Sequence, residues 1–392
     1  MPIRIQTVLA LTSLAALVPT IAPAQACITG RLAQRGTIQN WTSHISDSGN
    51  QTTTIRTQRG NCELRLDARG DFSMRPDLKA FDRVGDYVEV EERDGDKSRR
   101  VRVTSRGGVL EYRWTVDGVN GFDVDRDQWL ADMLLAVERL TGTMAKPRVA
   151  AMLQQGGVNA VLDETARLAT DYAKRMYFIE LFADAKLNDD QVERVLGQAA
   201  DSMSSDYERA ELIRMLATRG KMNDRLARGV IRVADRMSSD YEKRRALSAA
   251  IDAVSTPEAR TALFRTASSM SSSYELAELL IAAEARSFVD TVSAGAYFTA
   301  VDRVTSDYER HRTLSALLKQ HPTSPDILAG VLRASTSITS DFELASLLVE
   351  FAGTTPVRGE LRELYLKATR AITSDFEYRR ALQALLEQDR RT

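Results

Sequence analysis

Apolar and polar residues alternate along the first part of the chain. Side chains of a strand point alternately to two faces, so a period of two predicts strands with one buried face. Turn signals such as RDGDK and SRGG separate the runs. We therefore expect residues 27–122 to form a small antiparallel β domain, either sandwich-like or a rolled sheet. The clearest runs are CELRLDA (62–68), DYVEVEER (86–93), RRVRVTS (99–105) and VLEYRWTV (109–116).

The hydrophobic period changes near Asp125. RDQWLADMLLAVERLTG and AKPRVAAMLQQGG have the apolar spacing of amphipathic helices, and we assign residues 123–156 to a helical linker. From residue 157 to residue 392 the pattern is helical throughout. The predicted fold class is α+β and multidomain, with the β domain followed by an all-α superhelical solenoid.

A motif close to S/T-D-Y/F-E recurs through residues 157–392. Its aromatic residue returns at intervals of 35, 34, 33, 34, 34 and 34 residues. A constant period near 34 residues is typical of stacked helical hairpins. We predict about seven hairpins, in which one helix starts at the motif and a second precedes the next motif. The aromatic positions are Tyr172, Tyr207, Tyr241, Tyr274, Tyr308, Phe342 and Phe376.

The motif also predicts how its helix begins. Ser and Glu three residues apart have the spacing of a capping box, in which each side chain binds the backbone N–H of the other residue. The motif aspartate suits the positive end of the helix. We therefore assign a structural capping role to Ser205/Glu208, Ser239/Glu242, Ser272/Glu275, Ser306/Glu309, Ser340/Glu343 and Ser374/Glu377. Six evenly spaced copies are not expected of a catalytic carboxylate pair, which is needed once.

Other positions of the repeat carry apolar or charged residues. Six and nine residues after each aromatic the residue is apolar, and we place this stripe on the same face as the aromatic, which would fill the seam between helices. Four residues after the aromatic, acid alternates with base apart from one serine, and we predict a charge ladder between stacked helices. The ladder positions are Glu211, Arg245, Glu278, Arg312, Ser346 and Arg380.

The N-terminus has the features of an export signal. Residues 1–26 combine Arg4, a short apolar run and an A-x-A site at 24–26, which predicts a secretory signal peptide and a periplasmic or secreted protein. The two cysteines, Cys27 and Cys62, predict a disulfide in an oxidising compartment. The alternative is a lipid anchor on Cys27, although Gln25 fits a lipoprotein signal poorly.

The chemistry-bearing residues are few. The three histidines lie apart, and the chain lacks H-E-x-x-H, C-x-x-C, G-x-S-x-G and P-loop motifs, so we expect no enzyme, no metal site and no cofactor. Asp123, Asp125 and Asp127 have calcium-loop spacing, but Gln128 stands where the loop needs glycine, so Asp125 or Asp127 is expected to cap a helix instead. A formal net charge of −1 gives no indication of nucleic-acid binding.

The repeats SSDYEKRRALSA and TSDFEYRRALQALL resemble S-D-Y/F-E helical repeats of exported bacterial proteins. They are also similar to the extracytoplasmic C-terminal regions of membrane metallopeptidases of the β-lactam-sensor/antirepressor type. The resemblance covers roughly residues 60–388, but the zinc motif and the membrane helices of those peptidases are missing. It implies an envelope sensor or interaction module and carries over no catalytic residue.

The function that follows is a non-catalytic exported scaffold that binds a protein or peptide of the cell envelope along the solenoid. Its candidate binding residues, taken as surface positions of the motif helices, are Arg209, Lys243, Arg244, Arg310, His311 and Arg379. The alternative is an envelope sensor whose β domain binds a small molecule or glycan in a pocket lined by Trp41 and Trp114. A third possibility, an enzyme with an unrecognised site, would need convergent carboxylates between the domains.

Overall fold

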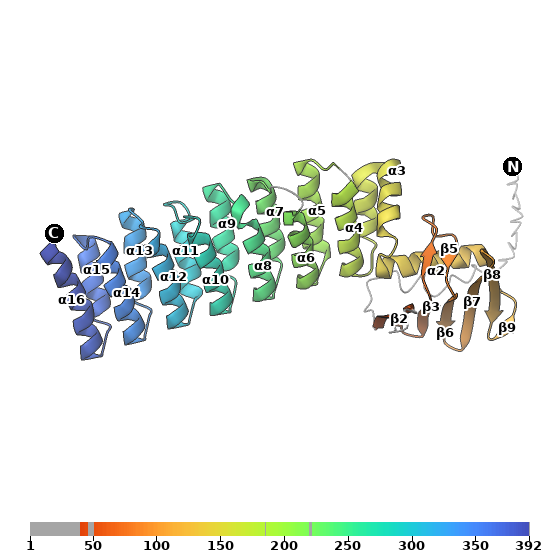
Figure 1. The fold of residues 1–392 in the computed structure, drawn as a ribbon, viewed down its shortest axis with the longest axis horizontal. Coiled ribbons are helices and arrows are strands. Elements are labelled where there is room, and N and C mark those ends of the chain that lie inside the picture. The colour runs from red at the N-terminus through yellow and green to blue at the C-terminus, as the bar shows by residue number, and fades with distance from the viewer. Residues whose placement is uncertain (1–39, 46–50, 185, 219–221, 392) are drawn as a thin grey trace, which may run out of the picture. The chain divides into compact units, whose positions relative to one another are not determined.

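The computed structural model describes residues 40–45, 51–184, 186–218 and 222–391. The chain divides into two compact units (Figure 1). The first contains the chain up to Ala136 except residues 74–78, and the second contains residues 74–78 and the chain from Val137 onward. The expected signal peptide and Cys27 lie outside the described residues.

The first unit is built on an antiparallel meander. Seven strands pair in the order β1-β2-β3-β6-β7-β8-β9, and β4 and β5 form a separate two-stranded ribbon between β3 and β6. The described strands thus form one main sheet, not the two facing sheets of a sandwich. They are β1 (Asn40–Ile45), β2 (Gln51–Arg59), β3 (Cys62–Arg69), β4 (Phe72–Met74), β5 (Phe81–Val84), β6 (Tyr87–Asp94), β7 (Lys97–Arg106), β8 (Val109–Val116) and β9 (Val119–Asn120).

One face of this sheet is apolar and buried. Helix α2 (Arg126–Thr141) supplies Trp129, whose ring lies 6.2 Å from that of Trp114 and whose indole N–H donates to buried Glu92 at 2.7 Å. The boundary between the two units falls within α2, inside the 123–156 segment that we expected to be a linker. The inward side chains of the sheet with no exposed surface include Cys62, Leu64, Leu66, Val88, Val90, Val101 and Val103.

The second unit is helical, as the 34-residue period predicted. Motif helices pack on motif helices, and the intervening helices pack on one another, so the hairpins stack in two layers (Figure 1). The motif helices are α4 (Asp171–Asp184), α6 (Asp206–Thr218), α8 (Asp240–Ala250), α10 (Ser273–Glu284), α12 (Asp307–Lys319), α14 (Asp341–Thr354) and α16 (Asp375–Arg391). The others are α3 (Ala145–Thr165), α5 (Asp189–Ser202), α7 (Asp224–Asp235), α9 (Pro257–Ala267), α11 (Ala294–Arg303), α13 (Pro325–Ser335) and α15 (Glu360–Thr369).

A continuous apolar core runs between the two helical layers from α5 to α16, and a second cluster lies among α3, α4, α5 and α6. The residues six positions after the motif aromatic, such as Leu247, Leu280 and Leu314, are fully buried in it. None of the described helices combines the length and apolar character that crossing a bilayer requires. The predicted α+β architecture with a helical repeat region is therefore confirmed.

Candidate functional site

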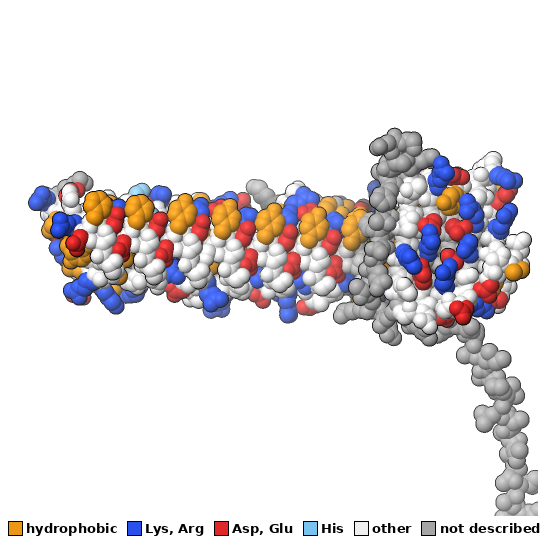
Figure 2. All heavy atoms as spheres, turned by 90° about the horizontal axis from the view of Figure 1, so that it is seen from below, with side chains coloured by type: hydrophobic (Ala, Val, Ile, Leu, Met, Phe, Trp, Pro, Cys, Tyr) orange, Lys and Arg blue, Asp and Glu red, His pale blue; other side chains and the backbone are white. Residues whose placement is uncertain are grey.

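The motif aromatics form a row on the surface of the helical unit. Their exposed fractions range from 52% at Tyr241 to 72% at Phe376, which is unusual for large apolar rings. Figure 2 shows hydrophobic side chains in one row along the helical array, with acidic side chains beside them. We call this row the aromatic stripe, and its members are Tyr207, Tyr241, Tyr274, Tyr308, Phe342 and Phe376.

The exposure of the stripe corrects our expectation that these rings fill the seam between helices. An α-helix turns about 100° per residue, so positions six and nine residues after the aromatic point about 240° and 180° away from it. Those positions are the buried ones, as Leu314 and Leu317 show in α12. Burial of this apolar pair turns Tyr308 outward, where it is 57% exposed.

Arginine side chains hold several rings of the stripe in place. The guanidinium carbon of Arg244 lies 5.6 Å from the ring centre of Tyr241, and that of Arg312 lies 5.7 Å from Tyr308. Arg380 lies 5.3 Å from Phe342, which belongs to the preceding repeat. Such cation–π contacts stabilise by about 0.5–1 kcal/mol at exposed sites. They orient one face of each ring without covering the stripe.

The motif aspartates connect each repeat to the next. One carboxylate oxygen of Asp206 accepts hydrogen bonds from the Ser238 N–H, the Ser238 hydroxyl and the Ser239 N–H, at 2.8–2.9 Å. Ser273 accepts the equivalent N–H bonds where one copy has serine instead of aspartate. Asp171, Asp240, Asp307 and Asp341 make the same set of contacts with the next repeat. Together with Asp206, these four residues are called the inter-repeat aspartates.

These contacts correct half of the capping-box prediction. The serine half is present, since the side chains of Ser239, Ser306 and Ser340 each accept from the N–H three residues on. The backbone N–H of the capping serine, however, donates to the aspartate of the preceding repeat. The motif glutamate forms an ion pair with a basic side chain instead. Hydroxyl residues at the position before each cap carried this signal in the sequence, namely Ser204, Ser238, Ser271, Thr305, Thr339 and Thr373.

Glu377 of the last motif shows the correction most clearly. We expected its carboxylate to bind the Ser374 N–H, but that N–H donates to Asp341 at 2.8 Å. Glu377 is instead buried, with 9% of its surface exposed, and its Oε2 pairs with Arg380 at 2.8 Å. This oxygen makes no hydrogen bond of normal geometry with the described residues. Only the backbone half of the capping role remains, in which the Glu377 N–H donates to the Ser374 hydroxyl at 3.5 Å.

The motif glutamates take part in the predicted charge ladder. Arg245 bonds Glu211 of the preceding repeat at 2.8 Å and Glu242 of its own helix at 2.7 Å. Arg312 does the same with Glu278 and Glu309, at 2.8 and 2.6 Å. The remaining inter-repeat contacts of this kind are Arg380–Ser346, Arg175–Glu208, Arg244–Glu275 and His311–Glu343. The ladder therefore exists, but as separate pairs and not as a continuous run.

Three of the six predicted binding residues are not on the surface. Arg209, Lys243 and Arg310 are 4–7% exposed, which corrects their assignment as surface positions. Their cationic groups bind the ends of neighbouring helices: the Arg209 guanidinium donates to the carbonyls of Arg236 and Ala200, at 2.9 and 3.1 Å. Cations are favoured at these negative helix ends.

The other three predicted residues lie closer to solvent. Arg244 and His311 are half-buried and engaged with the motif glutamates, and Arg379 is exposed. The structure therefore does not gather the six bases into one surface. The surface feature that it does gather is the aromatic stripe, whose exposure follows from the six- and nine-residue offsets of the buried positions once the rotation of the helix is applied.

An inter-repeat aspartate can be tested by substitution. Replacing Asp307 by alanine removes the acceptor of the Thr339 and Ser340 N–H groups, and we expect a loss of about 1 kcal/mol in the free energy of unfolding, measured by urea titration. The control is Asp375→Ala, at the same motif position, where the carboxylate accepts no hydrogen bond within the described part of the chain. If both variants lose the same amount of stability, the aspartate acts only on its own helix and the contact between repeats contributes nothing.

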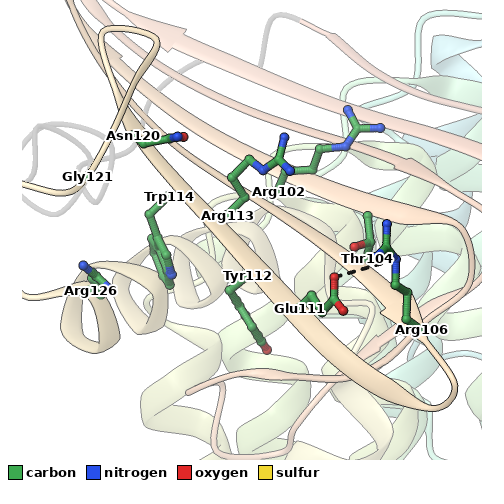
Figure 3. A pocket seen from close by; sticks show the side chains of 10 residues that line it. All are labelled: Arg102, Thr104, Arg106, Glu111, Tyr112, Arg113, Trp114, Asn120, Gly121 and Arg126. Carbon is green, nitrogen blue, oxygen red and sulfur yellow. Dashed lines mark ion pairs between the residues drawn. The ribbon is translucent and has the colours of Figure 1, made fainter.

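A second candidate surface lies at the β7–β8 end of the sheet. A cavity of about 510 Å³ there is lined by residues of β7, β8, the β9 turn and the start of α2 (Figure 3). Its lining residues come from both faces of the sheet: Arg102, Arg106 and Arg113 lie on the outer face, whereas Tyr112 and Trp114 lie on the same face as buried Val101 and Val103. The two rings stack with centres 6.1 Å apart and planes 14° apart. Trp114 thus lies where the ligand-binding alternative expected it, while the side chain of Trp41 is outside the described part of the structure.

The aspartate cluster before α2 is structural. Asp125 caps the helix by accepting from the Gln128 N–H at 2.8 Å, as one of the two expectations stated. Asp123 binds Arg99 and Lys97, at 2.9 and 2.5 Å. Hydrogen bonding from Arg99 lowers the pKa of Asp123. Within the described ranges, no group of three or more potential metal ligands comes together.

Cys62 starts β3 and is fully buried. Because Cys27 is not among the described residues, the Cys27–Cys62 disulfide stays a prediction. The lipid-anchor alternative at Cys27 stays open for the same reason.

Comparison with known proteins assigns no family. No family model matches the chain, and no curated protein matches it significantly. The resemblance to the antirepressor-type peptidases is therefore still a prediction. Indications of function come from the two candidate surfaces.

Proposed function

We propose that the protein is a non-catalytic exported scaffold whose aromatic stripe binds an extended segment of a partner polypeptide lengthwise. The observation that carries this proposal is the exposure of one large ring in each of six successive repeats. Aligned exposed rings are costly to keep in water and are typical of binding surfaces. Tyrosine is also enriched at interfaces, because its ring is apolar and its hydroxyl can form hydrogen bonds.

The spacing of the stripe favours one peptide conformation. Packed helices lie about 8–10 Å apart, so successive rings of the stripe are separated by about that distance. A polyproline II helix has three residues per turn and a rise of 3.1 Å per residue, which gives about 9 Å per turn. Residues on one face of a β-strand repeat every 6–7 Å or so, which does not match. A proline-rich segment would place one residue of each turn against one ring of the stripe.

Recognition of this kind has a physical advantage. A polyproline II segment is largely ordered before binding, so it loses little conformational entropy when it docks on aromatic side chains. The rings held by Arg244, Arg312 and Arg380 are likewise oriented in advance. Preorganisation of both partners raises affinity without requiring a large buried area.

The proposal predicts the behaviour of a stripe variant. Replacing Tyr241, Tyr274 and Tyr308 together by serine is expected to weaken binding of a fluorescein-labelled (Pro-Pro-Ala)₆ peptide by about 100-fold, since each ring contact contributes about 1 kcal/mol. Binding would be measured by fluorescence anisotropy. The thermal midpoint of unfolding should change little, because the rings are more than half exposed.

A matched control carries three serine substitutions at exposed bases away from the stripe. Arg265, Arg303 and Arg370 serve this purpose, and their variant should bind as the unaltered protein does. A glycine–serine peptide of equal length should bind neither protein. Equal binding by the stripe variant and the control would contradict the proposal, and so would the absence of binding to the unaltered protein.

A further inference from the structure

The outer face of the main sheet carries an excess of arginine. Its positions alternate with the buried ones along each strand, so the register of β2, β3, β6, β7 and β8 identifies them. They hold eight arginines, no lysine and five carboxylates, whereas the whole chain has a formal net charge of −1. The arginines are Arg56, Arg65, Arg69, Arg93, Arg100, Arg102, Arg106 and Arg113, and the carboxylates are Glu63, Asp67, Glu89, Glu91 and Glu111.

The arginine side chains of this face are paired but not covered. Arg93 and Arg100 share Glu91, each at 3.1 Å. The side chains of the seven arginines that form ion pairs remain 42–81% exposed. A guanidinium has five N–H donors, so a paired arginine can still donate to a second anion. Figure 2 shows basic and acidic side chains spread across the unit that contains the sheet.

The excess is greatest on β7 and β8. Their outward positions hold four arginines and one carboxylate, Glu111, which lies 3.8 Å from Arg106. Arg102 and Arg113 are directly opposite each other in the strand register, and like charges in this arrangement destabilise a sheet. Arg113 is exposed and forms no ion pair with any residue that the structure describes. An anion bound from outside the protein would reduce this repulsion.

The distribution of these charges favours a surface of anionic groups as the partner. Neighbouring strands lie about 4.8 Å apart, so five strands spread the arginines over a width of about 19 Å. Charges spread in two dimensions match a layer of headgroups better than they match a single chain.

The outer face also lacks the stacked rings on which nucleic-acid bases or sugars bind. Tyr87 is the only aromatic residue among the outward positions of these strands, and the guanidinium carbon of Arg102 lies 4.0 Å from its ring centre. Tyr112 and Trp114 point to the opposite side of the sheet from Arg113 (Figure 3). The interactions that this face offers are therefore mainly electrostatic.

We propose that the outer face of the sheet binds the surface of an anionic lipid bilayer, with its arginines in contact with the lipid phosphates. Arginine suits this role because its planar guanidinium binds phosphate oxygens in a bidentate manner. Each base near such a surface strengthens binding by about fivefold. Binding of this kind is reversible and weakens as salt screens the charges. The proposal is independent of the aromatic stripe.

Sedimentation with lipid vesicles tests the proposal on the full chain. At low salt we expect the protein to sediment with vesicles made of phosphatidylglycerol and phosphatidylcholine in equal parts, and to stay in solution with pure phosphatidylcholine. High salt should release it from the anionic vesicles. Equal binding to both kinds of vesicle, or binding to neither, would overturn the proposal. Binding to polyphosphate or single-stranded DNA but not to vesicles would also overturn it, because the ligand would then be a linear polyanion.

Two variants with opposite charge changes connect the binding to this face. Arg102→Gln combined with Arg113→Gln removes two bases and should weaken binding to anionic vesicles by about 25-fold. Glu111→Gln removes a carboxylate of the same face and should strengthen binding by about fivefold. The thermal midpoint of unfolding checks that both variants keep their fold.

The matched control removes two exposed bases from the helical unit. Arg265→Gln combined with Arg303→Gln lowers the net charge as the first variant does, and it should bind as the unaltered protein does. Equal weakening in the control and in the Arg102/Arg113 variant would reduce the effect to net charge. That result, or a Glu111→Gln variant that binds no better than the unaltered protein, would overturn the proposal.

Discussion

Glu284→Gln should make the helical unit more stable at pH 8.5 and leave its stability almost unchanged at pH 5. Glu284 ends α10, is 1% exposed, and neither carboxylate oxygen has a hydrogen-bond partner in the part of the chain that is described. Burial raises the pKa of Glu284 to about 8. The nearby Tyr297 hydroxyl opposes this shift but makes no hydrogen bond of normal geometry.

The sign of the effect follows from proton linkage. Between the ordinary carboxyl pKa of 4.5 and the folded value of about 8, the folded chain holds a proton that the unfolded chain has lost. Stability therefore falls as the pH rises through this range. The gain for the glutamine variant at pH 8.5 should be on the order of 5 kcal/mol, since the pKa rises from 4.5 to about 8 and each pKa unit corresponds to about 1.4 kcal/mol. Urea unfolding at both pH values measures it.

The control for Glu284 is an exposed glutamate of the same unit. Glu363→Gln in α15 changes the same group in contact with water, so the pH dependence of unfolding should be that of the unaltered protein. If Glu284→Gln also keeps the original pH dependence, the buried carboxyl is not the titrating group. Hydrogen exchange in α10 and α11 would then locate the group that is.

Arg209→Leu is expected to cost about 3 kcal/mol of unfolding free energy. The guanidinium of Arg209 is buried and donates to the carbonyls of Ala200, Met203 and Arg236, which close the C-terminal ends of α5 and α7. It also bonds Asp206 at 3.2 Å. Removing it leaves buried acceptors and a carboxylate without their donor, which is more costly than losing an exposed ion pair.

Two comparisons make this measurement specific. Arg214→Leu removes an exposed arginine of the same helix and should cost no more than about 0.5 kcal/mol. Arg209→Lys keeps the charge but not the fork of donors, so an intermediate loss is expected. A loss at Arg209 no larger than that at Arg214 would contradict the role assigned to the buried guanidinium.

The repeat architecture was predictable because its signals are local and periodic. The 34-residue interval, the serine caps and the buried leucines at fixed offsets each follow from helix geometry, and the structure confirms them. The β strands were equally visible from alternation, as in β3 and β6. A period of two shows which residues of a strand face the core, but it carries no information about whether a second sheet packs on that face.

The errors concern which way a side chain points. Arg209 and Tyr207 are two residues apart on one helix, and polarity suggested that the arginine is exposed and the tyrosine buried. The structure reverses this, because the arginine reaches carbonyl groups of other helices whereas the tyrosine follows the helical face away from the core. The carbonyl partners of the arginine come from other helices, so they could not be known before the stacking of the hairpins was known. In the same way, the sequence did not show that Arg102 and Arg113 lie opposite each other, since this depends on the register of β7 and β8.

The pairwise form of the charge ladder has a consequence for how such an array can change in length. Helices with a double basic site, such as Arg244/Arg245, alternate with helices that carry alanine and an acid or serine, such as Ala277/Glu278. In α8 and α12 the first base pairs with the following repeat and the second with the preceding one. Excision of one hairpin would bring two helices of the same kind together, whereas excision of two would restore every partner. The unit whose removal keeps every pair is therefore a double hairpin of about 68 residues, twice the repeat period.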